Sequence, residues 1–161
     1  MQGEEGKKGE GLIREFRSDV DAGAVAEILR EAKEAADWPE AELRGLESLA
    51  GVSAFVGVGG NAILGFVVGR RVLDEAEILN LAIRAGARRQ GEGRKLVMRL
   101  LEEFRKNRVS RVFLEVRESN RGAIAFYEQL GFRAAGERKG YYQDPPEAAV
   151  VMEAWLREST D

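Results

Sequence analysis

The sequence predicts a mixed α/β protein built around one twisted sheet, on the basis of three observations. Segments with strand character alternate with segments of helical apolar spacing, in the order β-α-α-β-β-β-α-β-α-β-β. The length of 161 residues suits a domain with a sizeable core, and 44% hydrophobic with 33% charged residues is typical of a globular chain. No internal repeat or low-complexity linker interrupts this order. We therefore expect helices packed on a central sheet within a single domain over residues 12–161.

Composition narrows the possible chemistry. The net charge of −3 argues against a surface built mainly for nucleic acid or for an anionic membrane, so we expect neither as a partner. The chain contains no cysteine and no histidine, which excludes disulfides, a cysteine-bound acyl intermediate and Ser-His-Asp catalysis. The commonest zinc ligands are absent for the same reason, and no metal site is expected. Carboxylates, tyrosine, lysine and backbone amides remain as catalytic groups.

The N-terminal residues MQGEEGKKGEG offer almost nothing to bury, which predicts a flexible tail over residues 1–11. They are also too polar for a signal peptide. No apolar run approaches the ~20 residues that a membrane-spanning helix needs. These features together predict a cytoplasmic location.

The first half of the chain predicts one strand, two helices and a hairpin. Strand character over 12–17 precedes Ser18-x-x-Asp21, a capping-box-like helix start. A second helix is expected from Asp37-Trp38-Pro39 to Gly51. The segments 52–58 and 62–68, joined by Gly59-Gly60-Asn61, predict a β-hairpin, and a third strand follows over 75–83. The apolar positions that predict the two helices are Val25, Ile28, Leu29 and Ala32, then Leu43, Leu46 and Leu49.

Gly59 and Gly60 could be mistaken for part of a nucleotide-binding motif. The G-x-G-x-x-G spacing is absent, and no helical pattern follows, so a hairpin turn is the better interpretation. A different stretch, Arg88-Arg89-Gln90-Gly91-Glu92-Gly93-Arg94, lies between the strand over 78–83 and a helical apolar pattern. A helix that begins there directs unpaired N–H groups and the positive end of its dipole at one place. The helix is predicted by Leu96, Val97, Leu100, Leu101 and Phe104.

This stretch predicts an anion-binding loop, although a tight strand-to-helix turn without a ligand is an equally good interpretation of the two glycines. Its three arginines add the fixed positive charge that a metal-free pyrophosphate site requires. The Gly-Lys-Ser/Thr ending of a P-loop is missing, which disfavours hydrolysis of a nucleoside triphosphate.

Two side chains farther along the chain are candidates for acid–base chemistry. Glu115 lies in the middle of a predicted strand over 111–116, where a carboxylate is unusual. The simpler interpretation is a strand carboxylate that faces water or pairs with Arg117. Tyr127 lies on a helix that Ser119-Asn120 is expected to cap, and it could equally be a packing aromatic. Two closing strands, near 132–140 and 148–156, are expected to flank a loop over 141–146.

These features together resemble a known family. The run from Leu114 to Phe132, LEVRESNRGAIAFYEQLGF, resembles the C-terminal half of the GNAT acetyltransferase superfamily, and within it the RimI-type ribosomal-protein alanine N-acetyltransferases. Arg88–Arg94 resembles the superfamily's acetyl-CoA pyrophosphate loop. The segments 72–76 and 141–142 are also similar to RimI-type segments, so the resemblance covers roughly 12–156. It implies a mostly antiparallel central sheet with helices on both faces.

The resemblance implies an acetyl-CoA-dependent N-acetyltransferase with acetyl-CoA as co-substrate. It makes Glu115 the general base and Tyr127 the general acid. The implied acceptor is the N-terminal α-amino group of a protein, namely the N-terminal alanine of a small-subunit ribosomal protein. A small-molecule amine acceptor and a non-catalytic acyl-CoA-binding module are the alternatives. The implied cofactor-binding residues are Leu81, Ala82, Ile83, Arg89, Gln90, Gly91, Glu92, Gly93, Arg94 and Asn120.

The sequence departs from the family pattern in two places near this site. Arg84-Ala85-Gly86 replaces the usual acidic-or-histidine and proline turn after the third strand. Glu92 occupies a loop position that is usually apolar. Its side chain is therefore expected to turn away from the phosphates.

Overall fold

The computed structural model describes residues 11–156, whose contacts divide into two compact units. The first unit comprises residues 11–68 and 80–100, and the second comprises residues 69–79 and 101–156. The helical and strand elements are β1 (Leu12–Glu15), α1 (Ser18–Glu31), α2 (Glu40–Arg44), η1 (Leu46–Ser48), β2 (Val52–Gly59), β3 (Ala62–Val72), β4 (Glu75–Ile83), η2 (Ala85–Ala87), α3 (Glu92–Lys106), β5 (Arg111–Arg117), α4 (Arg121–Gln129), β6 (Arg133–Gln143) and β7 (Pro146–Trp155).

The strands form a seven-stranded sheet in the order β1-β2-β3-β4-β5-β7-β6. The pairs β1/β2, β5/β7 and β6/β7 are antiparallel, whereas β4 and β5 are parallel. A parallel pair requires a crossover, and here the chain between β4 and β5 contains α3. The predicted α/β class with a mostly antiparallel sheet is confirmed.

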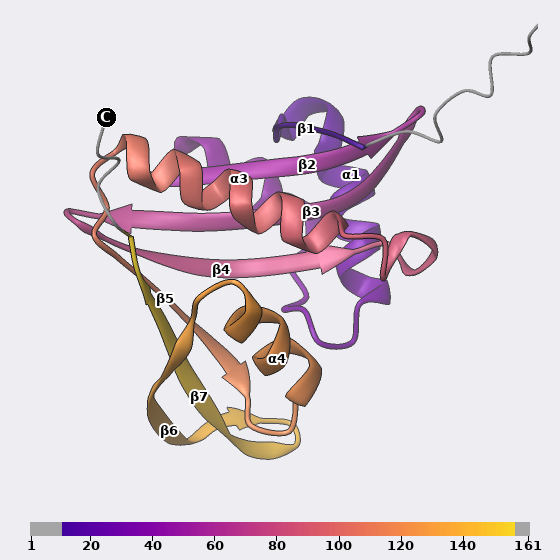
Figure 1. Ribbon diagram of the computed structural model, residues 1–161. Helices are drawn as coiled ribbons and strands as arrows, with labels where there is room; N and C mark the ends of the chain where they lie inside the picture. The colour runs from indigo at the N-terminus through magenta and orange to yellow at the C-terminus, as the bar shows by residue number, and fades with distance from the viewer. Residues whose placement is uncertain (1–10, 157–161) are drawn as a thin grey trace, which may run out of the picture. The chain divides into compact units, whose positions relative to one another are not determined.

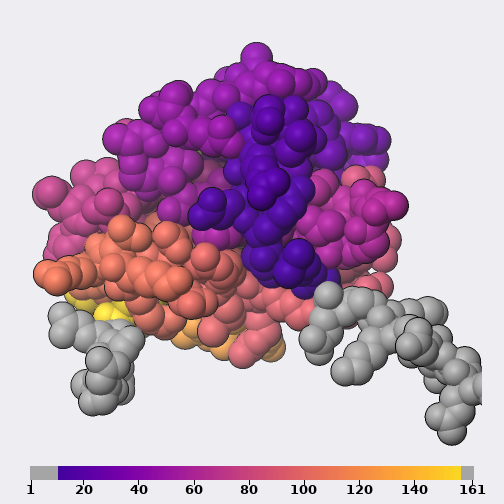
Figure 2. Space-filling view, turned by 90° about the horizontal axis from the view of Figure 1, so that it is seen from above, coloured from indigo at the N-terminus to yellow at the C-terminus, as the bar shows by residue number. Residues whose placement is uncertain are grey.

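The first unit packs its strands between two helices. Figure 1 shows α3 in front of β2 and β3, and α1 behind them. Val25, Ile28 and Leu29 of α1 are each no more than 1% exposed, as the helical spacing predicted. In the space-filling view, β1 and α1, in indigo, lie on one face of this unit (Figure 2). The helix α1 is joined to β1 by Asp21, which accepts two hydrogen bonds from the Arg14 guanidinium, at 2.7 and 2.8 Å.

Two predictions for the first helices were wrong in detail. Ser18 does not cap α1, because both its backbone N–H and its hydroxyl donate to the carboxylate of Glu47, 2.7 and 2.9 Å away. Asp21 instead accepts the N–H of Arg17, the N-cap residue. The second helix is also shorter than expected: α2 spans five residues, and a separate 3₁₀ turn, η1, carries Leu46. Local sequence patterns cannot predict a hydrogen-bond partner as distant in the chain as Glu47 is from Ser18.

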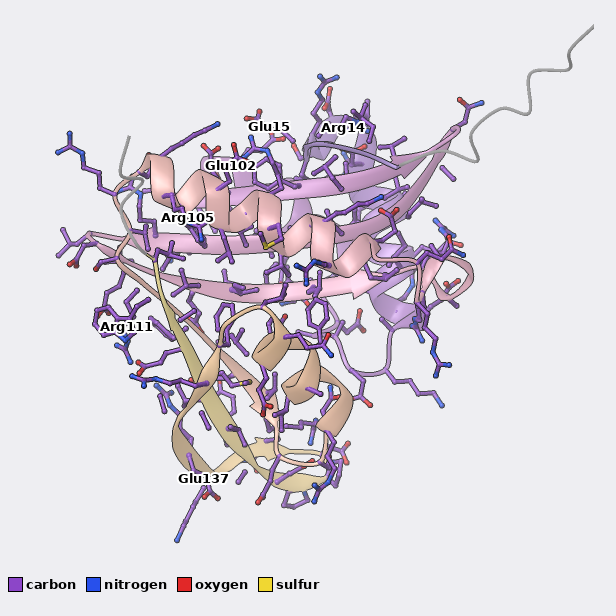
Figure 3. The ribbon with its side chains drawn as sticks, in the orientation of Figure 1. Arg14, Glu15, Glu102, Arg105, Arg111 and Glu137 are labelled. Carbon is purple, nitrogen blue, oxygen red and sulfur yellow. The ribbon has the colours of Figure 1, made fainter. Side chains whose placement is uncertain are left out.

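The second unit is built on β5, β6 and β7. Along β5, Val112, Leu114 and Val116 are buried and the residues between them are half-buried, so the predicted alternation is confirmed. Arg111 joins three strands at one end, since its guanidinium lies 2.7 Å from Glu153 of β7 and 3.4 Å from Glu75 of β4 (Figure 3). The expected loop over 141–146 was too long, because β6 continues to Gln143 and β7 begins at Pro146.

One glycine of the first unit permits the close approach of three elements. A Cβ at Gly65 of β3 would lie 2.7 Å from Ile83 Cδ1, 2.9 Å from Leu96 Cδ1 and 3.1 Å from the Ala82 carbonyl oxygen. We predict that Gly65→Ala lowers the free energy of unfolding by ~2 kcal/mol in urea titration, because an added methyl group has no space. Gly86→Ala is the matched control, since nothing lies within 4 Å of its Cβ position. Equal effects of the two substitutions would contradict the packing argument.

No helix within residues 11–156 is long and apolar enough to cross a membrane. The predicted tail over 1–11 lies, apart from Gly11, outside the described residues.

Candidate functional site

The predicted site residues lie in both units, and the anion-binding loop belongs to the first. After β4 the chain makes the short turn η2 and reaches Arg89, which has φ 63°, and Gly91, which has φ 82°. A left-handed conformation at a non-glycine residue costs of order 1 kcal/mol and is concentrated at functional sites. Arg89, Gln90 and Arg94 have exposed side chains here. The loop therefore presents two cationic side chains at the start of α3.

The start of α3 has the features of an anion site. The first hydrogen bond of the helix runs from the Lys95 N–H to the Gly91 carbonyl, at 3.1 Å. The N–H groups of Glu92, Gly93 and Arg94 therefore precede the first helical donor, Lys95, and have no acceptor within the helix. These groups and the positive end of the helix dipole suit a phosphate. The geometry is compatible with the predicted anion-binding loop.

The unusual turn before the loop is held by backbone acceptors of β3. The Arg84 N–H donates to the Leu64 carbonyl at 2.7 Å, and its Nε donates to the Ile63 carbonyl at 2.9 Å. Arg88 Nε donates to the Ile83 carbonyl at 3.2 Å. Side-chain hydrogen bonds from two arginines thus hold the turn that replaces the expected proline-containing one.

Glu92 turns its side chain toward β1 and β2. A Cβ at Gly11 would lie 2.9 Å from Glu92 Oε1, and a Cβ at Gly57 of β2 would lie 3.1 Å from Oε2. The residue is 5% exposed, and Oε2 has no hydrogen-bond partner among the described residues. Its nearest cation is Lys95, with Nζ 3.9 Å from Oε1. Glycines at both contact positions therefore make room for a carboxylate that is buried with little compensation.

We predict that Glu92→Met raises the free energy of unfolding by about 1 kcal/mol in urea titration. Removing a buried, unpartnered oxygen contributes about 1–3 kcal/mol, and loss of an acidic group at a helix start offsets part of it. Glu102→Met, on an exposed part of the same helix, should change stability by less than ~0.5 kcal/mol. A clear loss of stability in Glu92→Met would mean that the carboxylate is held by a favourable partner.

Glu115 lies in the second unit, on β5, between two groups of β6. Its carboxylate Oε1 is 3.1 Å from Arg138 Nε, and its side chain is 9% exposed, against 58% for Arg138. Interaction of the Tyr141 hydroxyl with the same carboxylate, together with burial, raises the pKa of Tyr141 to about 12. The arrangement presents a shielded carboxylate with one close cation and with lone pairs for further donors.

The simpler interpretation of Glu115 is wrong in both of its forms. The carboxylate does not face water, and its cation is Arg138 rather than Arg117. Arg117 instead lies 3.3 Å from the Glu147 carboxylate, with its guanidinium 4.2 Å from the Tyr142 ring centroid. These contacts hold the end of β6 that carries the two tyrosines.

Tyr127 lies on α4 and is 6% exposed. Its ring makes edge-on contacts with Phe126 and Phe132, at centroid distances of 5.0 and 5.5 Å. Burial raises the pKa of the Tyr127 phenol well above its ordinary value. A phenol in such surroundings stays protonated at neutral pH and can donate a proton.

Asn120 caps α4, as predicted, because its Oδ1 accepts the Ala123 N–H at 3.0 Å. Among the residues implied to line the strand next to the cofactor, Ala82 is buried, while Leu81 and Ile83 are half-buried. Asn80, which precedes them, donates to the Ala36 carbonyl at 2.9 Å and so ties β4 to the segment after α1.

The sequence interpretation missed two charged residues next to Glu115. Arg138 is one, and Glu77 of β4 is the other. Burial raises the pKa of Glu77, the charge of Glu115 raises it further, and the charge of Arg138 lowers it. An acidic residue directly before the run Ile78–Ile83, within the predicted strand, was a usable signal for Glu77. Arg138 carried none, because only the pairing of β6 with β7 brings it near β5.

No group of three or more acidic, histidine or cysteine side chains suited to a metal ion occurs within residues 11–156.

Comparison with known proteins agrees with the geometry. The model of the acetyltransferase (GNAT) family matches residues 23–132. The [ribosomal protein bS18]-alanine N-acetyltransferase of Escherichia coli K12 is 45% identical over 89 residues, which cover 54% of this chain and 60% of that relative. The chain thus spans less than two thirds of the relative's length.

Solved structures extend the likeness over the whole fold. The crystal structure of the ribosomal-protein-S18-alanine N-acetyltransferase from Escherichia coli has a TM-score of 0.83 at 32% identity, and covers 94% of this chain and 97% of its own. Ard1 from Thermoplasma volcanium has a TM-score of 0.82 at 30% identity, over 92% of this chain and 99% of its own. The family model matches well over half of the chain, and the fold agrees with it. This protein belongs to the GNAT family of acetyltransferases.

Proposed function

We propose that the protein is an acetyl-CoA-dependent N-acetyltransferase that acts on the N-terminal α-amino group of a protein. The single observation that carries the proposal is the environment of Glu115. A side chain that is 9% exposed on β5 pairs with Arg138 and interacts with Tyr141, as expected of a positioned general base. A non-catalytic acyl-CoA-binding module would have no use for this arrangement.

The acetyl-CoA side of the site is assigned to the first unit. Its support is the left-handed loop before α3, with exposed Arg89 and Arg94 and with the N–H groups of Glu92, Gly93 and Arg94 ahead of the first helical donor. Such a donor set fits a pyrophosphate. The backbone of Leu81, Ala82 and Ile83 is proposed to pair with the pantetheine arm. Gln90, Gly91 and Asn120 complete the proposed cofactor-binding residues.

The proton transfers are assigned to two residues. Acetyl-CoA supplies a thioester as the acetyl donor. An α-amino group has a pKa of about 7.7–8.0, so Glu115 accepts its proton, directly or through water, with little pKa tuning. The Tyr127 phenol, which burial keeps neutral, donates a proton to the thiolate that leaves. The chain has no cysteine, in agreement with direct transfer to the amine.

The acceptor is proposed from the relatives' names. Both E. coli proteins described above are named as alanine N-acetyltransferases of ribosomal protein S18. We propose the N-terminal alanine of a small-subunit ribosomal protein as the acceptor here. A single catalytic domain over residues 12–161 and a cytoplasmic location belong to the same proposal.

Turnover of acetyl-CoA on a panel of acceptors tests the proposal. The panel contains hexapeptides that begin with alanine, serine or methionine, together with spermidine and n-butylamine. Acetylation of the alanine peptide above the others is the expected result. Activity on the small amines alone would transfer the proposal to a small-molecule acetyltransferase. Binding of acetyl-CoA without transfer to any acceptor would indicate a non-catalytic module.

A further inference from the structure

Three charged side chains of the second unit form a cluster with two carboxylates and only one cation. Glu115 on β5 pairs with Arg138 on β6 at 3.1 Å. Glu77 on β4 has no hydrogen bond and no ion pair within 4.0 Å in the part of the chain that the structure describes. Its side chain is nevertheless half-buried. Two carboxylates and one guanidinium leave the cluster with a charge of −1.

The strand register places both carboxylates on one face of the sheet. Glu77 of β4 is opposite Phe113 of the parallel strand β5. Side chains alternate between faces along a strand, so Phe113 and Glu115 project to the same side. Glu77 therefore projects to that side as well, and its pKa responds to the charges of both Glu115 and Arg138.

Arrival of the acceptor creates a conflict at Glu115. The α-amino group of the acceptor is largely an ammonium ion below its pKa of about 8. To transfer its proton it must approach the carboxylate to which the Arg138 guanidinium is bound. Two cations on one shielded carboxylate repel each other, and the repulsion is strong where water is excluded. One of the two cations needs another anion.

Arg138 is the group that can move. Its side chain is 58% exposed, and only its Nε is paired with Glu115, whereas Glu115 is shielded on a central strand. A long side chain that is mostly in water changes rotamer at small cost. The unpaired carboxylate that also faces it is Glu77.

We propose that Glu77 is the second partner of Arg138, which pairs with Glu115 in the free enzyme and with Glu77 when the acceptor's ammonium group occupies Glu115. This inference rests on the proposed role of Glu115 in acetyl transfer. Glu77 and Arg138 are positioning residues in this scheme. Binding of the ammonium group makes the cluster neutral, since its charge of +1 cancels the charge of −1 in the free enzyme.

Acceptor binding in the presence of saturating CoA tests the exchange without turnover. The probes are a hexapeptide that begins with alanine and its N-acetylated form, which lacks the ammonium group. We expect Glu77→Gln to raise the Kd of the free-amine peptide about fivefold, as for a half-exposed ion pair. The Kd of the acetylated peptide should change less than about twofold. In turnover, the acceptor KM should rise by the same factor and kcat should stay within about twofold.

A double-mutant cycle separates the exchange from a direct contact. In an Arg138→Gln background, Glu77→Gln should not raise the Kd of the free-amine peptide further. In an Arg138→Lys background, Glu77→Gln should raise this Kd as it does in the parent. Glu137→Gln is the matched control, because Glu137 is an exposed carboxylate of β6 next to Arg138 (Figure 3). Additive effects in the two backgrounds, equal effects on both peptides, or an unchanged Kd would each overturn the inference.

Failure of the proposed acceptor remains distinguishable from failure of the exchange. If the parent enzyme acetylates only small amines, the same cycle is measured with n-butylamine, which also carries one ammonium group. If Glu77→Gln leaves the Kd unchanged for every amine that the parent binds, the exchange alone is overturned. Full activity of Glu115→Gln overturns the assignment on which both depend.

Discussion

Glu115→Gln is expected to lower kcat for acetyl transfer by about 10²–10⁴-fold. The amide keeps the shape of the side chain and can accept hydrogen bonds from Arg138 and Tyr141, but it cannot accept the proton of the acceptor's ammonium group. The measurement is release of CoA from acetyl-CoA with the alanine-initiated peptide. The KM for acetyl-CoA should stay within about twofold, because none of the pyrophosphate-binding residues is changed.

Two controls make this result specific to the base. Glu137→Gln removes an exposed carboxylate from β6 and should leave kcat unchanged. The thermal midpoint of Glu115→Gln, followed by circular dichroism, should show a cooperative unfolding transition. The variant is expected to fold because Arg138, which loses its charged partner, is mostly in water. A kcat within threefold of the parent would remove Glu115 from the catalytic groups and leave the cofactor loop untouched.

Tyr127→Phe is expected to lower kcat by about 10²-fold, the lower range for a general acid. The ring and its contacts with Phe126 and Phe132 are kept, so only the proton donor is lost. Because a leaving group of lower pKa needs less protonation, an acetyl donor with a more acidic thiol should reduce the difference between variant and parent. Tyr142→Phe is the matched control on β6 and should retain at least a third of the parent kcat.

The pH profile gives a second measurement of Tyr127. Its pKa is raised by burial, so the phenol remains protonated as pH rises through the ordinary tyrosine range near 10. The parent should therefore show no loss of kcat from phenol ionisation between pH 7 and about 9.5. A tyrosine-like loss below pH 9 that Tyr127→Phe abolishes would show that the group is less shielded than its 6% exposure indicates.

The elements that the sequence predicted well are those whose patterns are local. The strand over 75–83 and the helix capped by Asn120 are found with the predicted bounds or cap, because alternation and capping depend on residues a few positions apart. Ser18 and the Tyr141-Tyr142 segment were misjudged. Their structures depend on Glu47 and on the pairing of β6 with β7, neither of which local spacing contains.

The candidate site divides in the same way. The loop Arg88–Arg94 and Glu115 stood out in the sequence because each is an unusual turn or residue for its element, whereas the resemblance to the family singled out Tyr127. The arginine expected beside Glu115 was Arg117, its neighbour in sequence, whereas the structure supplies Arg138 from a strand that returns along β7. Likewise, Gly11 and Gly57 explain where Glu92 can go, and no spacing rule connects them to it.

The sequence alone determined the α/β class, the order of the elements, the glycine-containing turn before α3 and the absence of cysteine and histidine chemistry. Those properties follow from periodicity, turn residues and composition, which are local or global sums over the chain. Only the tertiary structure decided which charges meet: Arg138 pairs with Glu115, and the charges of both act on Glu77. Electrostatic interactions act through space, so strand register rather than sequence distance determines which ionisable groups are coupled.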